Sequence, residues 1–145
     1  MIVVDASIAA KCLFPEEHTE QAVDLVDATL AAGERIVAPP LLWIEVANIL
    51  RQRMRRAGLT LAQALDLFDR FQEIPINSQS PSGLSRRALV LADRYQLAAV
   101  YDAHYVALAE MIGADVWTDD QRLLRAVRNK VPAVRWIGDY EPQQP

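Results

Sequence analysis

The chain has 145 residues and a mass of 16.2 kDa, about the size that a single hydrophobic core supports. Apolar residues make up 52% and charged residues 23% of the sequence, a balance that excludes disordered and fibrous proteins. The net charge of −4 argues against tight nonspecific binding to nucleic acid, but it permits a concentrated acidic site for divalent cations.

Short apolar runs alternate with longer helical patterns along the first half of the chain. Strands are predicted at Ile2–Val4 and Ile36–Ala38, with a weaker candidate at Ile74–Asn77. Helices are predicted over Ala6–Phe14, Thr19–Ala32 and Leu41–Ala57, and from the capping residue Thr60 to Glu73. Gly33 and Gly58 each end a helix, because glycine adopts the left-handed conformation that a helix end often requires.

The polar loop Ser78–Gly83 separates the second half from the first. Helices are predicted over Leu84–Tyr95, Val100–Met111 and Asp120–Asn129, and strands at Asp115–Thr118 and Ala133–Ile137. Residues 1–140 would then form one domain, followed by a short flexible C-terminal tail at Glu141–Pro145. Strands that alternate with helices predict an α/β fold with a parallel sheet covered on both faces.

Cysteine usage and hydropathy indicate the compartment. Cys12 is the only cysteine and cannot form an internal disulfide, which favours a reducing environment. The first residues lack the basic region of a signal peptide, and no apolar run reaches the roughly 20 residues that a membrane span needs. We therefore expect a soluble, cytoplasmic protein without membrane contact.

Carboxylates recur at places where parallel sheets bind ligands. Asp5 follows the first predicted strand, and Asp119 and Asp120 follow the strand at 115–118, so all three lie at the carboxyl edge of the sheet. Two helices add further acids. Glu45 lies at the margin of an apolar stripe, and Asp102 belongs to a helix that is apolar nearly all round, where a charge requires a partner.

Each acid also has an ordinary structural explanation. Asp5 and Asp120 precede helices and Asp102 lies in a first helical turn, where aspartate caps backbone N–H groups. Glu45 fits that explanation badly, because it lies about four residues into its helix. Carboxylates gathered at one edge would repel each other by on the order of 4 kcal/mol per pair at about 4 Å. A divalent cation relieves this repulsion, and oxygen ligands without clustered cysteine or histidine favour Mg²⁺ or Mn²⁺ over Zn²⁺.

Four segments resemble the acidic motifs of PIN-domain nucleases of the VapC type: VVDASIAAK, PPLLWIEVANIL, YDAHYVALAE and VWTDDQRLL. Their order and spacing match that family from Ile2 to about Trp136. The resemblance implies a PIN-like three-layer α/β/α fold with a central, mostly parallel sheet of short strands. It also implies a Mg²⁺-dependent endoribonuclease that hydrolyses RNA phosphodiester bonds, with Mn²⁺ as a substitute. Such an enzyme would be the toxin of a type II toxin–antitoxin module, with RNA as substrate, a cognate antitoxin as partner and a homodimer as its assembly.

The resemblance further implies roles for individual residues. The catalytic metal ligands would be Asp5, Glu45, Asp102 and Asp120, with Ser7, Asn48 and Thr118 as polar supports. In the fourth motif a threonine is followed by a variable residue and then an acid, which assigns the metal to Asp120. Asp119 is then an additional acid that assists through water or faces solvent. Lys11 and Arg122 each lie near an acidic motif, and we consider substrate contact or simple surface placement for both.

Two groups of residues outside the motifs have open interpretations. His18 and His104 lack the spacing of metal ligands, and we interpret them as ordinary surface or packed residues. The apolar residues of the helix that follows Thr60 either pack in the core or form a groove for a dimer mate or an antitoxin helix. They are Leu61, Leu65, Leu67, Phe68 and Phe71.

Two other classes of protein gather acids in a similar way. A phosphoacceptor receiver-like signalling domain also binds Mg²⁺ at the carboxyl edge of a parallel sheet. It would need a lysine just after a late strand, where Trp136-Ile137-Gly138 stands instead, and it leaves Glu45 unexplained. A catalytically idle PIN-like module would bind partners only. RNA cleavage under metal titration separates these alternatives from the nuclease.

Overall fold

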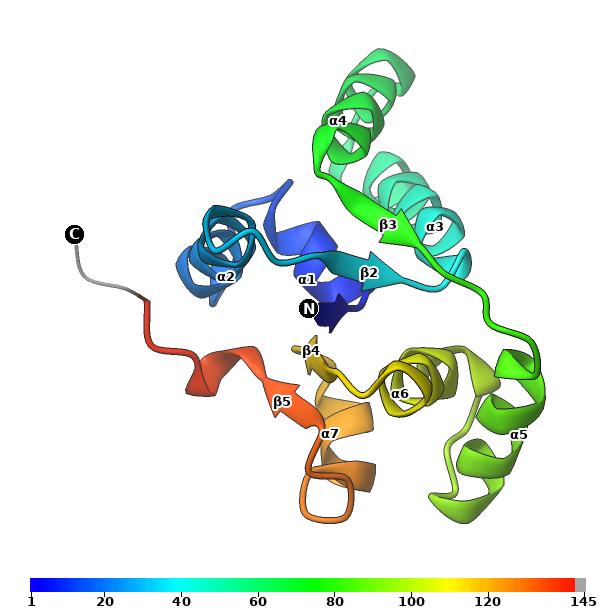
Figure 1. Cartoon of the computed structure of the whole chain (residues 1–145). Coiled ribbons are helices and arrows are strands. Elements are labelled where there is room, and N and C mark those ends of the chain that lie inside the picture. The colour runs from blue at the N-terminus through cyan, green and yellow to red at the C-terminus, as the bar shows by residue number, and fades with distance from the viewer. Residues whose placement is uncertain (143–145) are drawn as a thin grey trace.

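Five short strands form one sheet in the computed structural model, which describes residues 1–142 (Figure 1). The strands are β1 (Ile2–Val4), β2 (Ile36–Ala38), β3 (Ile76–Ser78), β4 (Asp115–Thr118) and β5 (Val134–Trp136). Their order is β3-β2-β1-β4-β5, and every neighbouring pair is parallel. The predicted α/β class and parallel sheet are confirmed.

Seven α-helices occur in the described residues. They are α1 (Ala6–Lys11), α2 (Thr19–Ala31), α3 (Leu41–Ala57), α4 (Leu61–Glu73), α5 (Leu84–Arg94), α6 (Val100–Ile112) and α7 (Gln121–Val127). A short 3₁₀ turn, η1 (Ile137–Asp139), follows the last strand and was not predicted. The predicted tail at Glu141–Pro145 lies mostly outside the described residues.

Three predicted elements have a boundary that is wrong by two residues or more, and the other boundaries agree to within one residue. Helix α1 ends at Lys11 rather than Phe14, because the chain then tightens into a turn in which the Leu13 and Phe14 amides both donate to Ala10 O. Strand β3 begins at Ile76, after an extended link through Pro75, rather than at Ile74. Helix α7 ends at Val127 rather than Asn129. The chain forms a tight turn there, because the amides of residues 130 and 131 both donate to the carbonyl of Val127.

The register of the strands divides the core into two clusters. Val37, Val3, Val116 and Val134 are paired across the sheet and form one buried row on the side of α5, α6 and α7. Val4 and Ile36 lie on the other face with the apolar side of α2. Figure 1 shows α2 and α6 on opposite sides of the sheet, as a three-layer α/β/α arrangement requires.

The strand order places a crevice at one edge of the sheet. From β1 the chain continues to β2 on one side, whereas the other neighbour of β1 is β4, which comes much later in sequence. In open parallel sheets such a reversal leaves space at the carboxyl ends of the strands. Asp5 directly follows β1, and Asp119 and Asp120 directly follow β4. The topology therefore brings residues more than 100 positions apart to one place.

The two interpretations of the helix after Thr60, core packing and an apolar groove, each describe part of its residues. Phe71 is buried in the core, whereas Leu61 and Leu65 are exposed and, with Phe68, line an apolar groove of about 290 Å³ between α3 and α4. Among residues 1–142, no helix combines the length and apolar character needed to cross a bilayer.

The two faces of α5 give a test of the core. Leu91 is 2% exposed and Leu89 is 65% exposed on the same helix. We expect Leu91→Ala to lower the free energy of unfolding by about 2–5 kcal/mol, because it removes buried apolar contacts and leaves a cavity. Leu89→Ala should change it by less than about 0.5 kcal/mol. Urea unfolding of both variants measures this, and equal effects would contradict the assigned faces of α5.

Candidate metal centre

Asp5 is the buried member of the acidic group. Asp5 is 5% exposed. Its Oδ1 accepts hydrogen bonds from the amides of Ser7 (2.9 Å) and Ile8 (3.2 Å), so Asp5 caps the N-terminus of α1. Burial raises the pKa of Asp5 to about 6, against the opposing effect of hydrogen bonds from Ser7 and Thr118. The capping role expected of an isolated aspartate is thus real. It holds the carboxylate rigidly at the end of β1.

Two hydroxyl groups connect Asp5 to the chain after β4. The Ser7 hydroxyl donates to Asp5 Oδ1 at 2.6 Å and accepts from the amide of Asp119 at 2.7 Å. The Thr118 hydroxyl donates to Asp5 Oδ2 and accepts from the amide of Asp120 at 2.9 Å. Both oxygens of Asp5 are therefore linked, each through one hydroxyl, to consecutive amides of the same turn. We call this arrangement the double hydroxyl bridge.

Glu45 is held by a tyrosine from a distant helix. The Tyr105 hydroxyl of α6 donates to Glu45 Oε2, and Tyr105 itself is 1% exposed. Burial is the main cause that raises the pKa of Glu45 to about 7, and the charges of Asp5, Asp102 and Asp120 raise it further. The same surroundings raise the pKa of the Tyr105 phenol, so this hydroxyl stays a donor. Tyr105 was not among the predicted site residues, and its contact with Glu45 was missed.

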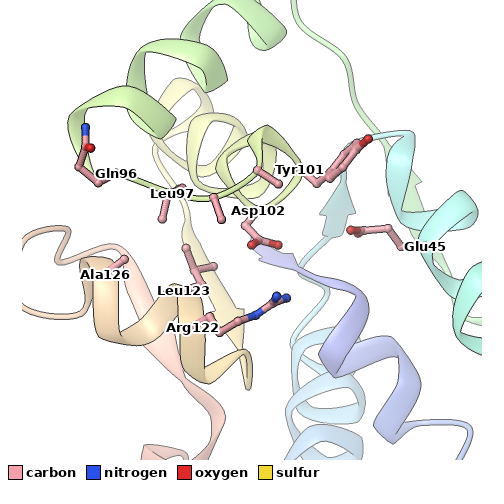
Figure 2. A pocket seen from close by; sticks show the side chains of 10 residues that line it. Glu45, Gln96, Leu97, Tyr101, Asp102, Arg122, Leu123 and Ala126 are labelled. Atoms are coloured by element: carbon pink, nitrogen blue, oxygen red, sulfur yellow. The ribbon is translucent and has the colours of Figure 1, made fainter.

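Asp102 and Asp120 complete the group. Asp102 lies in the first turn of α6, and Asp120 caps α7 by accepting from the amides of Arg122 (2.8 Å) and Leu123 (3.2 Å). Burial and then the charge of Asp120 raise the pKa of Asp102, while Arg122 lowers it. Figure 2 shows Asp102, Glu45 and the guanidinium of Arg122 facing one opening. The four predicted acids therefore influence each other's charge at one sheet edge.

The side chains are not arranged as a finished coordination sphere. Within residues 1–142, no three His, Cys, Asp or Glu side chains lie close enough together to hold a metal ion as they stand. Hydrogen bonds keep two of the four acids from turning toward a shared centre. Asp5 is fixed by the double hydroxyl bridge, and Asp120 caps its own helix. The donor set still fits a hard divalent cation, because it consists of carboxylate oxygens. In three of these groups, Asp5, Glu45 and Asp102, the pKa is raised, so a cation that offsets their charge would be favoured.

Asp119 points away from this group. Its carboxylate accepts from Lys11 Nζ at 2.8 Å and from Trp136 Nε1 at 2.8 Å, and it lies 3.4 Å from His18 Nδ1. Burial favours the neutral form, but the hydrogen bonds from Lys11 and Trp136 outweigh it and hold the pKa of Asp119 below its usual range. Asp119 is thus a structural anion that fixes the turn between β4 and α7.

This network corrects the prediction for Lys11. Its side chain is 6% exposed, and its ammonium is occupied by Asp119 and, at 3.7 Å, by Glu16. A substrate phosphate would have to displace a buried ion pair, so the placement does not fit a substrate contact. Arg122 is different, since its side chain is 79% exposed beside Asp120.

The indole that contacts Asp119 is itself held by close packing. The His18 ring packs edge-on against the Trp136 ring, with 5.4 Å between the ring centroids. His18 is therefore a packed residue, which is one of the two interpretations that the sequence allowed. A Cβ added at Gly138 would overlap the Trp136 ring. Glycine at this position therefore lets the indole fold back over the chain and reach Asp119.

One predicted support lies outside the hydrogen-bond network. Asn48 is exposed on α3, one turn after Glu45, and it makes none of the hydrogen bonds found in residues 1–142 around the acids. Ser7 and Thr118 are in contact with Asp5, as described above. The residues that sequence reasoning missed are Tyr105 and Trp136, which lie far along the chain from the carboxylates they bind.

The chain is similar to known proteins in sequence and in fold. The family model described as PIN domain matches residues 2–129. The chain is 35% identical over 124 residues to Ribonuclease VapC3 of Pyrobaculum aerophilum, which covers 84% of this chain and 91% of that protein. It is 34% identical over 123 residues to Ribonuclease VapC9 of Mycobacterium tuberculosis, covering 85% and 88%. A chain of a toxin–antitoxin complex from Klebsiella pneumoniae has the same fold, with a TM-score of 0.65 over 100% of both chains at 16% identity.

The double hydroxyl bridge can be opened by one substitution. Thr118→Val keeps the shape of the buried side chain but leaves the amide of Asp120 without its acceptor and Asp5 without one donor. We expect a loss of about 1–3 kcal/mol in the free energy of unfolding and weaker Mn²⁺ binding by calorimetry. Thr118→Ser, which keeps the hydroxyl, is the control and should retain most of both. Unchanged stability and metal affinity in Thr118→Val would show that the bridge is dispensable.

The raised pKa values predict a pH dependence of stability without metal. Asp5 and Glu45 have folded-state pKa values of about 6 and about 7, above those of the unfolded chain, so the folded state binds protons more tightly. The stabilisation is complete below about pH 4 and is lost as pH rises toward 7. In the presence of a chelator, the thermal midpoint of the wild type should therefore be lower at pH 7.5 than at pH 5. In Glu45→Gln the difference between the two pH values should be smaller. Mg²⁺ should raise the midpoint more at pH 7.5, and equal pH profiles for wild type and variant would contradict the assignment.

Proposed function

This chain belongs to the PIN-domain family, and from that premise we propose that it is a metal-dependent endoribonuclease that hydrolyses RNA phosphodiester bonds. Asp5, Glu45, Asp102 and Asp120 would hold Mg²⁺, for which Mn²⁺ can substitute. The observation that supports this most directly is the electrostatic coupling of these four acids, which come from four separate elements of the fold. The names of the VapC ribonucleases to which the chain is similar support RNA as the substrate.

Bound Mg²⁺ would supply Lewis-acid stabilisation of phosphate charge and a more acidic attacking water. The chain's own residues do the positioning. The double hydroxyl bridge fixes Asp5, and Tyr105 orients Glu45. Glu45 or Asp102 would take the proton of the attacking water, since both carboxyl groups line the opening beside the proposed metal site. The exposed guanidinium of Arg122 binds a substrate phosphate.

We also propose that the protein is the toxin of a type II toxin–antitoxin module. The names of its VapC relatives support this assignment, as does the length over which they match. Its partner would be a cognate antitoxin, its assembly a homodimer and its location the cytoplasm, where Cys12 stays reduced. The receiver-like alternative is set aside by family membership. The idle PIN-like module remains as an outcome of the cleavage experiment.

The nuclease is tested by removing one acid. Asp102→Asn should reduce Mg²⁺-dependent cleavage of a labelled single-stranded RNA at least about 100-fold, because it removes a charge that acts on the metal. The metal-free variant should stay folded or gain stability, since repulsion within the acidic group falls. Asp93→Asn, which changes an exposed acid of α5, is the matched control and should cleave like wild type.

Chelator should abolish cleavage, and either Mg²⁺ or Mn²⁺ should restore it. A wild-type protein that binds Mn²⁺ but cuts no RNA would be the idle module. A variant Asp102→Asn that cleaves at the wild-type rate would show that this group of acids is not the active site.

The two neighbouring aspartates should behave differently. Asp120→Asn should act like Asp102→Asn, with activity lost and the fold retained. Asp119→Asn should instead lower the thermal midpoint, because it leaves the buried Lys11 with only the more distant Glu16 as an anionic partner, while the folded fraction keeps measurable cleavage. Circular dichroism melts and cleavage rates of both variants decide this, and the reverse pattern would assign the metal to Asp119.

A further inference from the structure

A pocket of about 310 Å³ opens beside the acidic group. Its polar part is formed by Glu45, Asp102 and Arg122, and Figure 2 shows these side chains around the opening. Its wall continues over apolar atoms of Leu97, Leu123 and Ala126. This volume is at the lower end of the range in which small-molecule sites are found. Two of the four acids, Glu45 and Asp102, therefore border a space for one ligand unit of mixed polarity.

Tyr101 forms one side of this pocket and has little structural use. Its side chain is 62% exposed, whereas Tyr105, one helical turn further along α6, is 1% exposed and belongs to the core. Tyr101 directly precedes Asp102, and in Figure 2 its ring lies on the Glu45 side of the opening. An exposed aromatic face next to a metal site is suited to stack on a flat ring of a ligand.

Positive charge is concentrated next to the same pocket. The segment 121–130 contains Arg122, Arg125, Arg128 and Lys130 and no acidic residue, in a chain whose net charge is −4. Arg122 lines the pocket, and the exposed Arg125 and Lys130 line a second hollow of about 240 Å³ that shares Ala126 with the first. A chain of phosphates that leaves the acidic group along α7 would thus meet cations in succession.

We propose that this pocket binds one unstacked nucleotide of a single-stranded RNA, with its base against Tyr101 and its phosphate toward Arg122. The following phosphates run along α7 past Arg125 and Lys130. The inference rests on the proposed ribonuclease function and assigns to Tyr101 the contact with a base of the substrate. In a duplex the base faces are covered by their neighbours, so no base would reach Tyr101. The cations of α7 favour a nucleic acid over a peptide as the occupant.

The experiment compares Tyr101→Ala with Tyr101→Phe and with Leu89→Ala, an equally exposed apolar residue of α5 outside the pocket. We expect Tyr101→Ala to raise KM for a single-stranded oligoribonucleotide on the order of 10-fold, with a smaller change in kcat and an unchanged thermal midpoint. Tyr101→Phe and Leu89→Ala should stay close to wild type. The wild type should cleave the fully paired form of the same RNA at least about 10-fold more slowly.

A second measurement does not depend on cleavage. The four ribonucleoside 5′-monophosphates and inorganic phosphate are titrated into wild type and Tyr101→Ala in Mg²⁺. At least one nucleotide should bind more tightly than phosphate to the wild type, and Tyr101→Ala should remove that difference. Arg125→Gln should weaken RNA binding and reduce its salt dependence by about one ion, whereas Arg55→Gln, at the end of α3, should not.

The outcomes separate this proposal from the nuclease itself. If the wild type cleaves RNA but Tyr101→Ala has an unchanged KM, or nucleotides bind no better than phosphate, the stacking pocket is wrong and the nuclease stands. Equal cleavage of paired and unpaired RNA also overturns the pocket. If the wild type binds nucleotides through Tyr101 but cuts no RNA in Mg²⁺ or Mn²⁺, the nuclease proposal fails instead.

Discussion

The double hydroxyl bridge between Asp5 and the turn after β4 is the constraint on which the rest of the acidic group depends. Both oxygens of a buried carboxylate are bound, and the two hydroxyls that bind them pass the connection on to consecutive amides. Those amides begin the turn that leads into α7. The positions of Asp120 and Arg122 are therefore set by Asp5, across a separation of more than 100 residues.

This arrangement also explains how the fold tolerates clustered negative charge. Like charges at close range repel, and burial removes the water that would screen them. The protein responds in two ways. Asp119 is turned away from the acidic group onto Lys11 and Trp136, where its charge is neutralised by a buried cation. Asp5 and Glu45 instead have pKa values raised toward neutrality. A group left in that state gains most from a bound cation, which is the physical link between fold and proposed chemistry.

The sequence was sufficient for the sheet and for the position of aspartates at its carboxyl edge, and insufficient for the hydrogen-bond partners of the acids. The runs at β1 and β4 are short, apolar and followed by aspartate. Neighbouring residues in the sequence are therefore enough to predict them as strands of a parallel sheet. The distinction between Asp119 and Asp120 is not local. It depends on the contacts of Asp119 with Trp136 and Lys11. These contacts form only when β5 and α1 pack next to the turn after β4. For the same reason Lys11 was predicted as a possible substrate contact although the fold buries it.

Tyr101 and Tyr105 show the limit of periodicity in the same helix. Both flank Asp102 in a segment that is apolar nearly all round, so the hydrophobic pattern does not say which ring is buried. The packing of α6 against β1 and β4 decides it, placing Tyr105 under Glu45 and leaving Tyr101 at the rim. The acidic group then lies between an exposed aromatic ring and the cationic helix α7. A chain with a net negative charge therefore still presents cations beside its acidic group, on the side from which the phosphates would leave.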